Sequence, residues 1–367
     1  MKICILTNLK RYQRTFNILY PIYKWRQELR KAGVNIDIIY HHHDKKIQKA
    51  DKVIILNRYF EERESGNSSA PHLDSPAIHY IVELKNLGKE VIWFDVYDGT
   101  GTPDFRVIKY VDQFWKKQVF KDLSLYTLNR KDKSVRIWLD RIPEKSQYPD
   151  YYPCPEDQLH KIRVAWNIGL CDYRVFPRHL QYLRNYYHSP LVSFSEEAKT
   201  IDTSFRGKIK YDSDDHVSKQ REKLLKTIKH LEKNRIKTGP PIKYQDYLKE
   251  LSKSKIIVSP FGWGEICYRD FETFLVGSLL LKPSMNHINT FPNYFIDGTT
   301  YLSIDWKLEN FLDTFLSALD NYSKYKIIAS EGRNLFFKYS NNPKHFVEKF
   351  LSIIETVNTF EKAQFTK

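Results

Sequence analysis

The residues best suited to chemistry lie in one stretch of the chain, between Ser259 and Asn293. Gly262 and Gly264 follow a short apolar segment there, and glycine lets a backbone approach a ligand closely. Arg269 and Glu272 come next, in a segment expected to be a helix. Because helix N-terminal amides and arginine guanidinium groups both bind phosphate, this stretch predicts a site for a phosphorylated ligand.

A glutamate, a glycine and a buried strand follow one another in this stretch. Glu272 stands five residues before Gly277, which leads into the apolar segment 279–281. The pattern resembles the donor-binding half of the GT-B glycosyltransferases, in which such a glutamate holds the ribose of a nucleotide sugar. Retaining members of that class commonly carry a second acid eight positions earlier. Here that position is Gly264, with Glu265 beside it, so the anomeric outcome stays open.

Two longer sequence motifs in the same stretch add to the resemblance. The runs W-G-E-x-C-Y-R-D-F-E (263–272) and K-P-x-M-x-H (282–287) are similar to bacterial glycosyltransferases of surface-polysaccharide and lipopolysaccharide synthesis. They are more loosely similar to the exostosin domain. A strand ending at 205–208 and a helix with Arg221 also recur in exostosin-like transferases. The resemblance therefore implies that the second half of the chain binds a nucleotide sugar.

Basic side chains fit the departure of a nucleoside diphosphate, because fixed positive charges stabilise the leaving group without a metal ion. Arg206, Lys208 and Arg269 are the candidates for this role. A basic strand edge that prevents aggregation would explain the first two equally well. The predicted donor-binding residues are Arg206, Gly207, Lys208, Arg221, Trp263, Gly264, Tyr268, Arg269, Asp270, Glu272, Lys282 and His287. No cofactor or metal is expected besides the nucleotide sugar itself, which is a co-substrate.

A second group of acidic residues lies in the first half of the chain. Asp95 and Asp98 follow an expected strand, in a Gly- and Thr-rich loop similar to the D-x-x-D-x-x-G-T segment of the same bacterial transferases. A carboxylate there could remove the proton of an acceptor hydroxyl. Aspartate is also common in such turns because it caps backbone amides. The catalytic candidates are Asp95, Asp98 and Glu265, with no ranking between the two aspartates.

Short apolar segments and helical ones must position these residues. The expected strands are 2–7, 35–40, 52–56, 90–94, 203–209, 255–259 and 278–282. The expected helices are 17–32, 76–87, 216–233, 244–252, 268–276, 308–319, 323–339 and 343–359. Apolar strands that alternate with helices predict parallel sheets covered on both faces.

The predicted fold is α/β, with two Rossmann-like parallel sheets facing a central cleft as in the GT-B class. Residues 1–175 are expected to form the N-terminal acceptor domain and 176–340 the C-terminal donor domain. Residues 341–367 are expected to form a helix that returns to the N-terminal domain. A proline-rich stretch, 139–160, is expected to be an extended loop.

Composition limits the remaining possibilities. The 367 residues carry a formal charge of +15, which attracts polyanions such as nucleic acids, anionic lipids or phosphorylated small molecules. The four cysteines are too widely spaced to indicate a disulfide framework or a zinc site. No segment approaches the roughly 20 apolar residues that span a membrane. These features predict a cytoplasmic protein, with peripheral contact at the anionic inner face of the membrane as a further possibility.

The sequence thus predicts a metal-independent glycosyltransferase. Its acceptor would be a hydroxyl of a glycan or lipid-linked glycan in surface-polysaccharide or glycoconjugate synthesis. No nucleic-acid partner is expected, because no recognition motif such as a zinc finger is present. A basic nucleic-acid-binding protein is nevertheless the alternative from another class. A subunit that binds a sugar nucleotide without catalysing transfer is the third interpretation.

Overall fold

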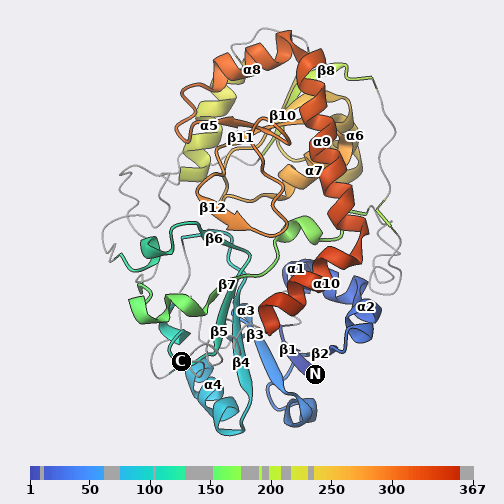
Figure 1. Ribbon diagram of the computed structural model, residues 1–367. Coiled ribbons are helices and arrows are strands. Elements are labelled where there is room, and N and C mark those ends of the chain that lie inside the picture. Colours follow the sequence, from blue (N-terminus) through green and yellow to red (C-terminus); the bar gives the residue numbers. More distant parts are fainter. Residues whose placement is uncertain are drawn as a thin grey trace, which may run out of the picture.

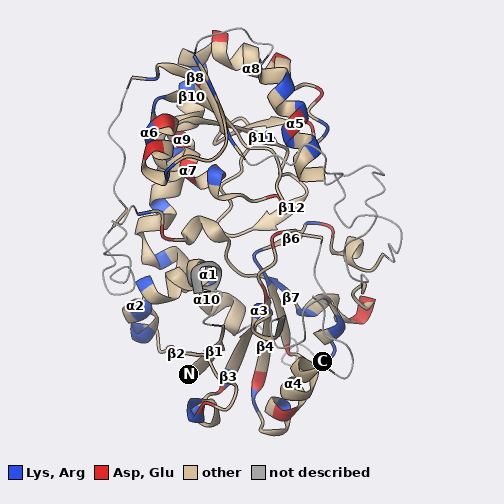
Figure 2. Ribbon diagram, turned by 180° about the vertical axis from the view of Figure 1, so that it is seen from behind, with Lys and Arg blue, Asp and Glu red and all other residues tan. Residues whose placement is uncertain are grey.

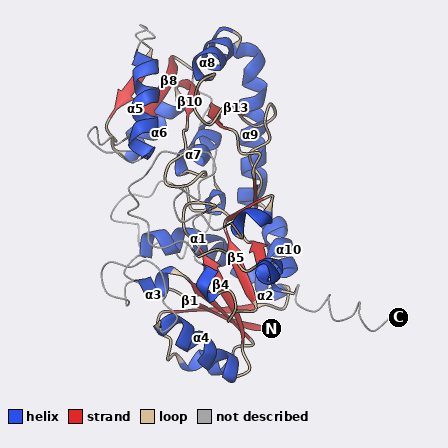
Figure 3. Ribbon diagram, turned by 90° about the vertical axis from the view of Figure 1, so that its left-hand side faces the viewer, coloured by secondary structure: helices blue, strands red, loops and turns tan. Residues whose placement is uncertain are grey.

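The chain forms two parallel sheets, each flanked by helices on both sides (Figure 1, Figure 3). The computed structural model describes residues 1–8, 12–61, 75–101, 105–128, 152–174, 190–191, 198–207, 216–229 and 235–355. The predicted strand 203–209 extends partly beyond these residues, as do the loop 139–160 and the helices 216–233 and 343–359. Lys208 also lies outside them.

The N-terminal sheet contains six parallel strands in the order β2-β1-β3-β4-β5-β7. The first four in sequence match the predicted apolar segments closely; β1, β3 and β4 are buried except for their first residues, whereas the edge strand β2 is partly exposed. The strand bounds are β1 Lys2–Leu6, β2 Asn35–Ile39, β3 Lys52–Leu56, β4 Glu90–Asp95, β5 Gln113–Lys116 and β7 Ile162–Val164.

Helices that cross between these strands cover the N-terminal sheet. Their bounds are α1 Tyr12–Lys24, α2 Arg26–Lys31, α3 Arg58–Glu61 and α4 Pro76–Asn86. The single helix predicted over 17–32 is two helices, because the backbone leaves the helical region at Trp25, with φ −110° and ψ 29°. Helix α4 begins as its sequence indicates, with the Ser75 hydroxyl accepting from the Ile78 amide.

The C-terminal sheet repeats the topology of the first five N-terminal strands. Its parallel order β9-β8-β10-β11-β13 corresponds to the order β2-β1-β3-β4-β5. The bounds are β8 Ile201–Arg206, α5 His216–Lys229, β9 Ile236–Gly239, α6 Tyr244–Ser252, β10 Ser254–Val258, α7 Tyr268–Val276, β11 Leu279–Pro283 and β13 Leu302–Ile304. In such sheets ligands bind at the carboxyl ends of the strands where the order reverses. In this domain, that place lies between β8 and β10.

The last helices connect the two domains. Helices α8 (Phe311–Asp320) and α9 (Tyr322–Asn341) cover the C-terminal domain, and α9 extends towards the N-terminal domain (Figure 1). Helix α10 (Pro343–Ile354) packs on the N-terminal domain, where the ring of Phe346 lies 5.3 Å from that of Trp166. Two Rossmann-like domains with returning C-terminal helices confirm the predicted GT-B architecture.

A small antiparallel sheet joins the domains directly. Strand β6 (Gln118–Phe120) of the N-terminal half pairs with β12 (Ile288–Thr290) of the C-terminal half. The largest hydrophobic core also contains residues from both halves, including Trp166, Phe271 and Phe336. The domains therefore form one continuously packed body.

Candidate functional site

The carboxyl ends of the two sheets meet through two loops. One loop, 96–101, follows β4, and the other, 259–267, follows β10. A Cβ atom at Gly264 would lie only 1.8 Å from the carbonyl oxygen of Asp98. Only glycine allows this approach, so the backbones of the two domains are in direct contact here. The carboxylate of Glu265 adds a hydrogen bond across the same interface, from the Thr100 amide at 3.0 Å.

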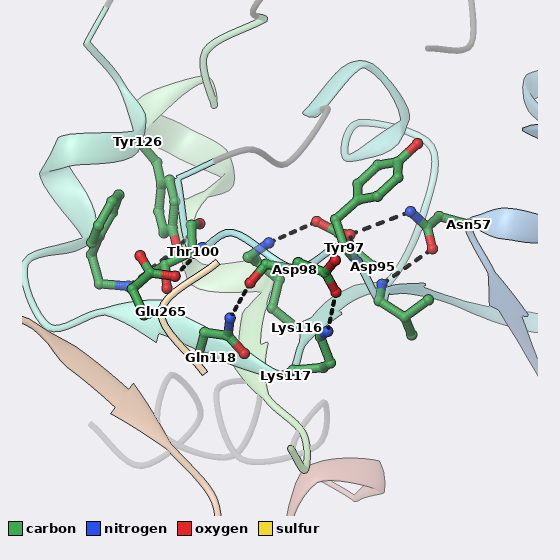
Figure 4. A network of polar contacts seen from close by, with 12 residues as sticks. Asn57, Asp95, Tyr97, Asp98, Thr100, Lys116, Lys117, Gln118, Tyr126 and Glu265 are labelled. Atoms are coloured by element: carbon green, nitrogen blue, oxygen red, sulfur yellow. Dashed lines mark hydrogen bonds and ion pairs between the residues drawn. The ribbon is translucent and has the colours of Figure 1, made fainter. Parts of the chain in front are cut away.

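The structure gives Asp95 an internal position (Figure 4). Its side chain is 1% exposed and pairs with Lys116 Nζ at 2.7 Å. The same carboxylate accepts hydrogen bonds from the Tyr97 amide at 2.9 Å and from Asn57 Nδ2 at 3.3 Å. Asp95 therefore holds the start of the loop and has little access to an acceptor.

Asp98 differs from Asp95 in its exposure. Its side chain is 57% exposed, although Lys117 Nζ lies 3.3 Å from one carboxylate oxygen. Its carbonyl oxygen accepts a hydrogen bond of 2.7 Å from Gln118 Nε2 (Figure 4). Asp98 thus combines a firmly held backbone with an accessible carboxylate, which is the arrangement that a general base requires.

Glu265 is fully buried between the domains. Its second oxygen lies 3.8 Å from Nε2 of His287, whose ring packs against Trp306 at 5.0 Å between centroids. Burial opposes ionisation, but His287 and the Thr100 amide outweigh it and lower the pKa of Glu265. Glu265 is therefore an anion inside the interface, hydrogen-bonded to the N-terminal half and facing His287 of its own half.

Helix α7 starts with a buried polar cluster. Asp270 accepts from the Cys267 amide at 2.9 Å and from the Ser259 hydroxyl at 2.5 Å. Lys282 Nζ lies 3.1 Å from the same carboxylate, and both side chains are 0% exposed. This pair fixes the start of α7 against β10 and β11. The sequence analysis placed both residues in the donor site; in the structure both side chains are fully buried and paired with each other.

Glu272 of α7 is buried, with 8% of the residue exposed, beside two tyrosines of α6. The hydroxyls of Tyr244 and Tyr247 on α6 lie close enough to lower its pKa, and Tyr247 also interacts electrostatically with Arg269. Burial raises the pKa of Glu272 to about 7, against the lowering influence of Arg269 and of the two tyrosines. Gly277, with φ +66°, then ends α7 in the left-handed conformation that glycine favours.

The titration of Glu272 predicts a pH-dependent stability. The folded-state pKa lies above the ordinary 4.5, so folding favours the protonated form. The stabilisation that comes from protonated Glu272 is fully present below about pH 4.5 and is lost as the pH rises through about 7. The loss in the free energy of unfolding amounts to about 3 kcal/mol. Glu272→Gln removes this titration. The melting temperature of the variant, relative to that of the wild type, should therefore rise between about pH 5 and pH 8. Parallel melting curves across this range would contradict the assignment.

Arg206 is held by the C-terminal domain itself. Its guanidinium bonds to Glu250 on α6 at 2.7 and 3.0 Å and to the Thr238 carbonyl at 2.8 Å. Its carbonyl oxygen in turn accepts a hydrogen bond from Arg269. Arg206 thus links β8, β9 and α6, whereas Arg269 reaches the end of β8.

The remaining predicted donor residues surround the end of β8 and the loop after β10. Gly207 follows β8, and a Cβ atom there would lie 3.9 Å from Cδ of Arg221 on α5. Trp263 is 50% exposed. Tyr268 is 41% exposed, and its hydroxyl accepts a hydrogen bond of 2.9 Å from Asn17 of the N-terminal domain. These residues lie at the reversal point where a ligand of the C-terminal sheet is expected.

Three residues of this region were missed by the sequence analysis. His216 is buried at the start of α5, with Nε2 3.3 Å from the Gly262 carbonyl and its ring 5.4 Å from that of Trp263. Tyr244 and Tyr247 were placed on a predicted helix without a role. Their spacing of three residues, which puts both on one helix face, was the available signal.

Two further observations concern metals and membranes. Within the described ranges, no group of three or more histidine, cysteine, aspartate or glutamate side chains is arranged to hold a metal ion. No helix in the described part of the chain is both long and apolar enough to cross a membrane. Basic and acidic side chains are interspersed, with lysines and arginines prominent on α2 and α5 (Figure 2).

Comparison with known proteins gives distant structural similarity. No protein-family model matches the chain, and no curated protein matches it in sequence. Anabaena Alr3699/HepE in complex with UDP-glucose is similar over 97% of this chain and 100% of that chain, with 8% identity and a TM-score of 0.45. T4 phage BGT in complex with its UDP-glucose substrate has the same coverage, 13% identity and a TM-score of 0.46. A glycosyltransferase from Rickettsia africae ESF-5 has 12% identity and a TM-score of 0.44, over 97% of this chain and 99% of that chain.

Proposed function

We propose that this chain is a glycosyltransferase that moves a sugar from a nucleotide-sugar donor to an acceptor hydroxyl. One observation carries the proposal. The loop with the exposed carboxylate of Asp98 contacts, through Gly264, the loop that leads into Arg269 and Glu272. An acceptor base and a nucleotide site are thereby joined at the facing ends of two Rossmann-like sheets.

The donor is proposed to bind at the reversal point of the C-terminal sheet. Glu272 would hold the ribose hydroxyls, since its carboxylate lies beside tyrosine hydroxyls and Arg269 at the start of α7. Arg269, Arg221 and Lys208 would hold the diphosphate. Arg206 would act mainly through its carbonyl bond to Arg269, because Glu250 engages its guanidinium. Positive charges fixed in this way stabilise the leaving diphosphate without a metal ion.

The proposed reaction is a direct displacement. The Asp98 carboxylate takes the proton of the acceptor hydroxyl, whose oxygen forms a bond to the anomeric carbon. The bond from that carbon to the phosphate oxygen breaks, and its electron pair leaves with the nucleoside diphosphate. Gly264 occupies the position of the second acid of retaining enzymes, and its backbone packs on Asp98. We therefore propose an inverting outcome.

The acceptor is proposed to be a hydroxyl of a glycan or lipid-linked glycan. The formal charge of +15 would favour an acceptor at an anionic membrane surface, at up to about 1 kcal/mol for each well-placed lysine or arginine. Incubation with anionic vesicles and sedimentation would test this association. Steep salt-dependent binding of DNA or RNA, in place of nucleotide binding, would instead favour the nucleic-acid interpretation.

A melting-temperature screen with UDP, GDP, CMP, ADP and their sugar derivatives tests the donor site. A ligand at 100 times its dissociation constant adds about 2.7 kcal/mol of stability, so one nucleotide family should raise the melting temperature clearly. Glu272→Ala should weaken this shift, whereas Glu309→Ala, at an exposed position outside the site, should retain it. Absence of a shift with every nucleotide would count against the proposal. A nucleotide shift without sugar transfer or donor hydrolysis would indicate a non-catalytic subunit.

A further inference from the structure

The N-terminal loop that carries Asp98 is held by both halves of the chain: Tyr126 of its own half donates to the Thr100 carbonyl, and two further contacts come from the C-terminal half. The Thr100 amide donates to Glu265, and the Asp98 carbonyl lies against the backbone of Gly264. The same carbonyl accepts from Gln118, whose strand β6 pairs with β12 of the C-terminal half. The backbone of residues 98–100 is therefore fixed partly from across the domain interface.

Glu265 is built to hold this loop rather than to meet a substrate. Its side chain is 0% exposed, one oxygen is bonded to the Thr100 amide, and the other faces His287. The Asp98 carboxylate, two residues before Thr100 in the N-terminal loop, is exposed. Because Glu265 belongs to the loop between β10 and α7, its bond to Thr100 ties that loop to the segment that carries Asp98.

We propose that Glu265 is a positioning residue that aligns the acceptor base Asp98 with the donor site. The inference rests on the proposed function and replaces the catalytic role predicted for Glu265. It links the two substrates: the 259–267 loop, which contacts the donor through Trp263 and α7, also sets the place of the base. A misplacement of about 1 Å in a reacting group costs about 10²-fold in rate.

The first test is a comparison of Glu265→Ala with Glu265→Gln. The alanine variant should lower kcat about 10²-fold while the KM for the donor and the melting shift with nucleotide stay unchanged. The glutamine variant keeps an oxygen for the Thr100 amide and should recover most of the activity. Hydrogen exchange in residues 96–101 should rise in the alanine variant, because the amide of Thr100 loses its acceptor. Unchanged kcat in a folded alanine variant would overturn the proposal.

A double-mutant cycle separates positioning from a general structural role. If Glu265 acts through Asp98, Glu265→Ala should lower kcat little further when Asp98 is already Asn. If the losses in kcat from the two substitutions are additive, the proposal is overturned. It is also overturned if weaker donor binding accounts for the whole loss of activity in Glu265→Ala. If the alanine variant does not fold, Glu265→Asp keeps the charge but shortens the reach to the Thr100 amide, and it should show the same non-additivity with Asp98→Asn.

The proposed function and this inference fail in different ways. If Asp98→Asn retains full transfer, or no transfer is found with any donor, the proposed function fails. If Asp98→Asn loses transfer but Glu265→Ala and Glu265→Asp do not, only the positioning role fails.

Discussion

Asp98→Asn should lower kcat for sugar transfer by about 10²- to 10⁴-fold, the range that a general base contributes. Asparagine has nearly the same shape but cannot accept the proton of the acceptor hydroxyl. The side chain is 57% exposed, so the variant should fold and keep the nucleotide-induced shift, although its melting temperature should fall somewhat because Lys117, only 8% exposed, loses its partner. Steady-state transfer kinetics with the donor found in the screen would measure the loss.

Asp313→Asn is a matched control for this variant. Asp313 is an exposed aspartate in the first turn of α8, in the C-terminal domain and away from both loops of the site. It should retain full activity. Wild-type rates in Asp98→Asn would remove the base from the proposed mechanism and leave only the donor site.

Asp95→Asn should act on stability instead. Its carboxylate and Lys116 form a pair that is almost completely buried, and removal of one partner leaves the other charge without compensation. Such losses cost about 3–5 kcal/mol. Burial lowers the pKa of Lys116 even in the presence of Asp95. Without Asp95 the folded state favours neutral Lys116 while the unfolded state binds a proton, so the stability of the variant should rise with pH.

Urea unfolding at several pH values would measure this effect. The double variant Asp95→Asn with Lys116→Met should be more stable than Asp95→Asn alone, because no buried charge remains. A double variant that is less stable than the single one would show that the two residues do not act as a pair. Activity per folded molecule should stay near the wild-type value in Asp95→Asn, in contrast with Asp98→Asn.

The ranking of the two aspartates could not be predicted from their own loop. It depends on Lys116 and Lys117, which lie on strand β5 and directly after it, about twenty residues further along the chain. Consecutive residues of an extended chain point to opposite faces, and these lysines reach different aspartates. The segment was not expected to be a strand, because its two lysines interrupt the apolar pattern that marks buried strands.

In the C-terminal domain the helices and strands were easier to predict than the side-chain contacts. Helix α7 has the predicted bounds, because a glycine ends it and a periodic apolar face defines it. Periodicity alone cannot predict that its acidic residues have different partners. Asp270 faces Lys282, on the strand that follows the helix, while Glu272 faces the tyrosines of α6. Arg206 likewise required knowledge of Glu250, which only the packed structure brings beside it.

Helix α10 has a consequence for how the chain is made. The rings of Phe346 and Phe350 lie against Trp166 and Trp115 in the core of the N-terminal domain. Synthesis proceeds from the N-terminus, and domains generally begin to fold during it. Here the first domain stays without part of its core until the ribosome has passed residue 350. Apolar surface of the first domain therefore stays exposed until α10 has been made, which is after both parallel sheets have been synthesised.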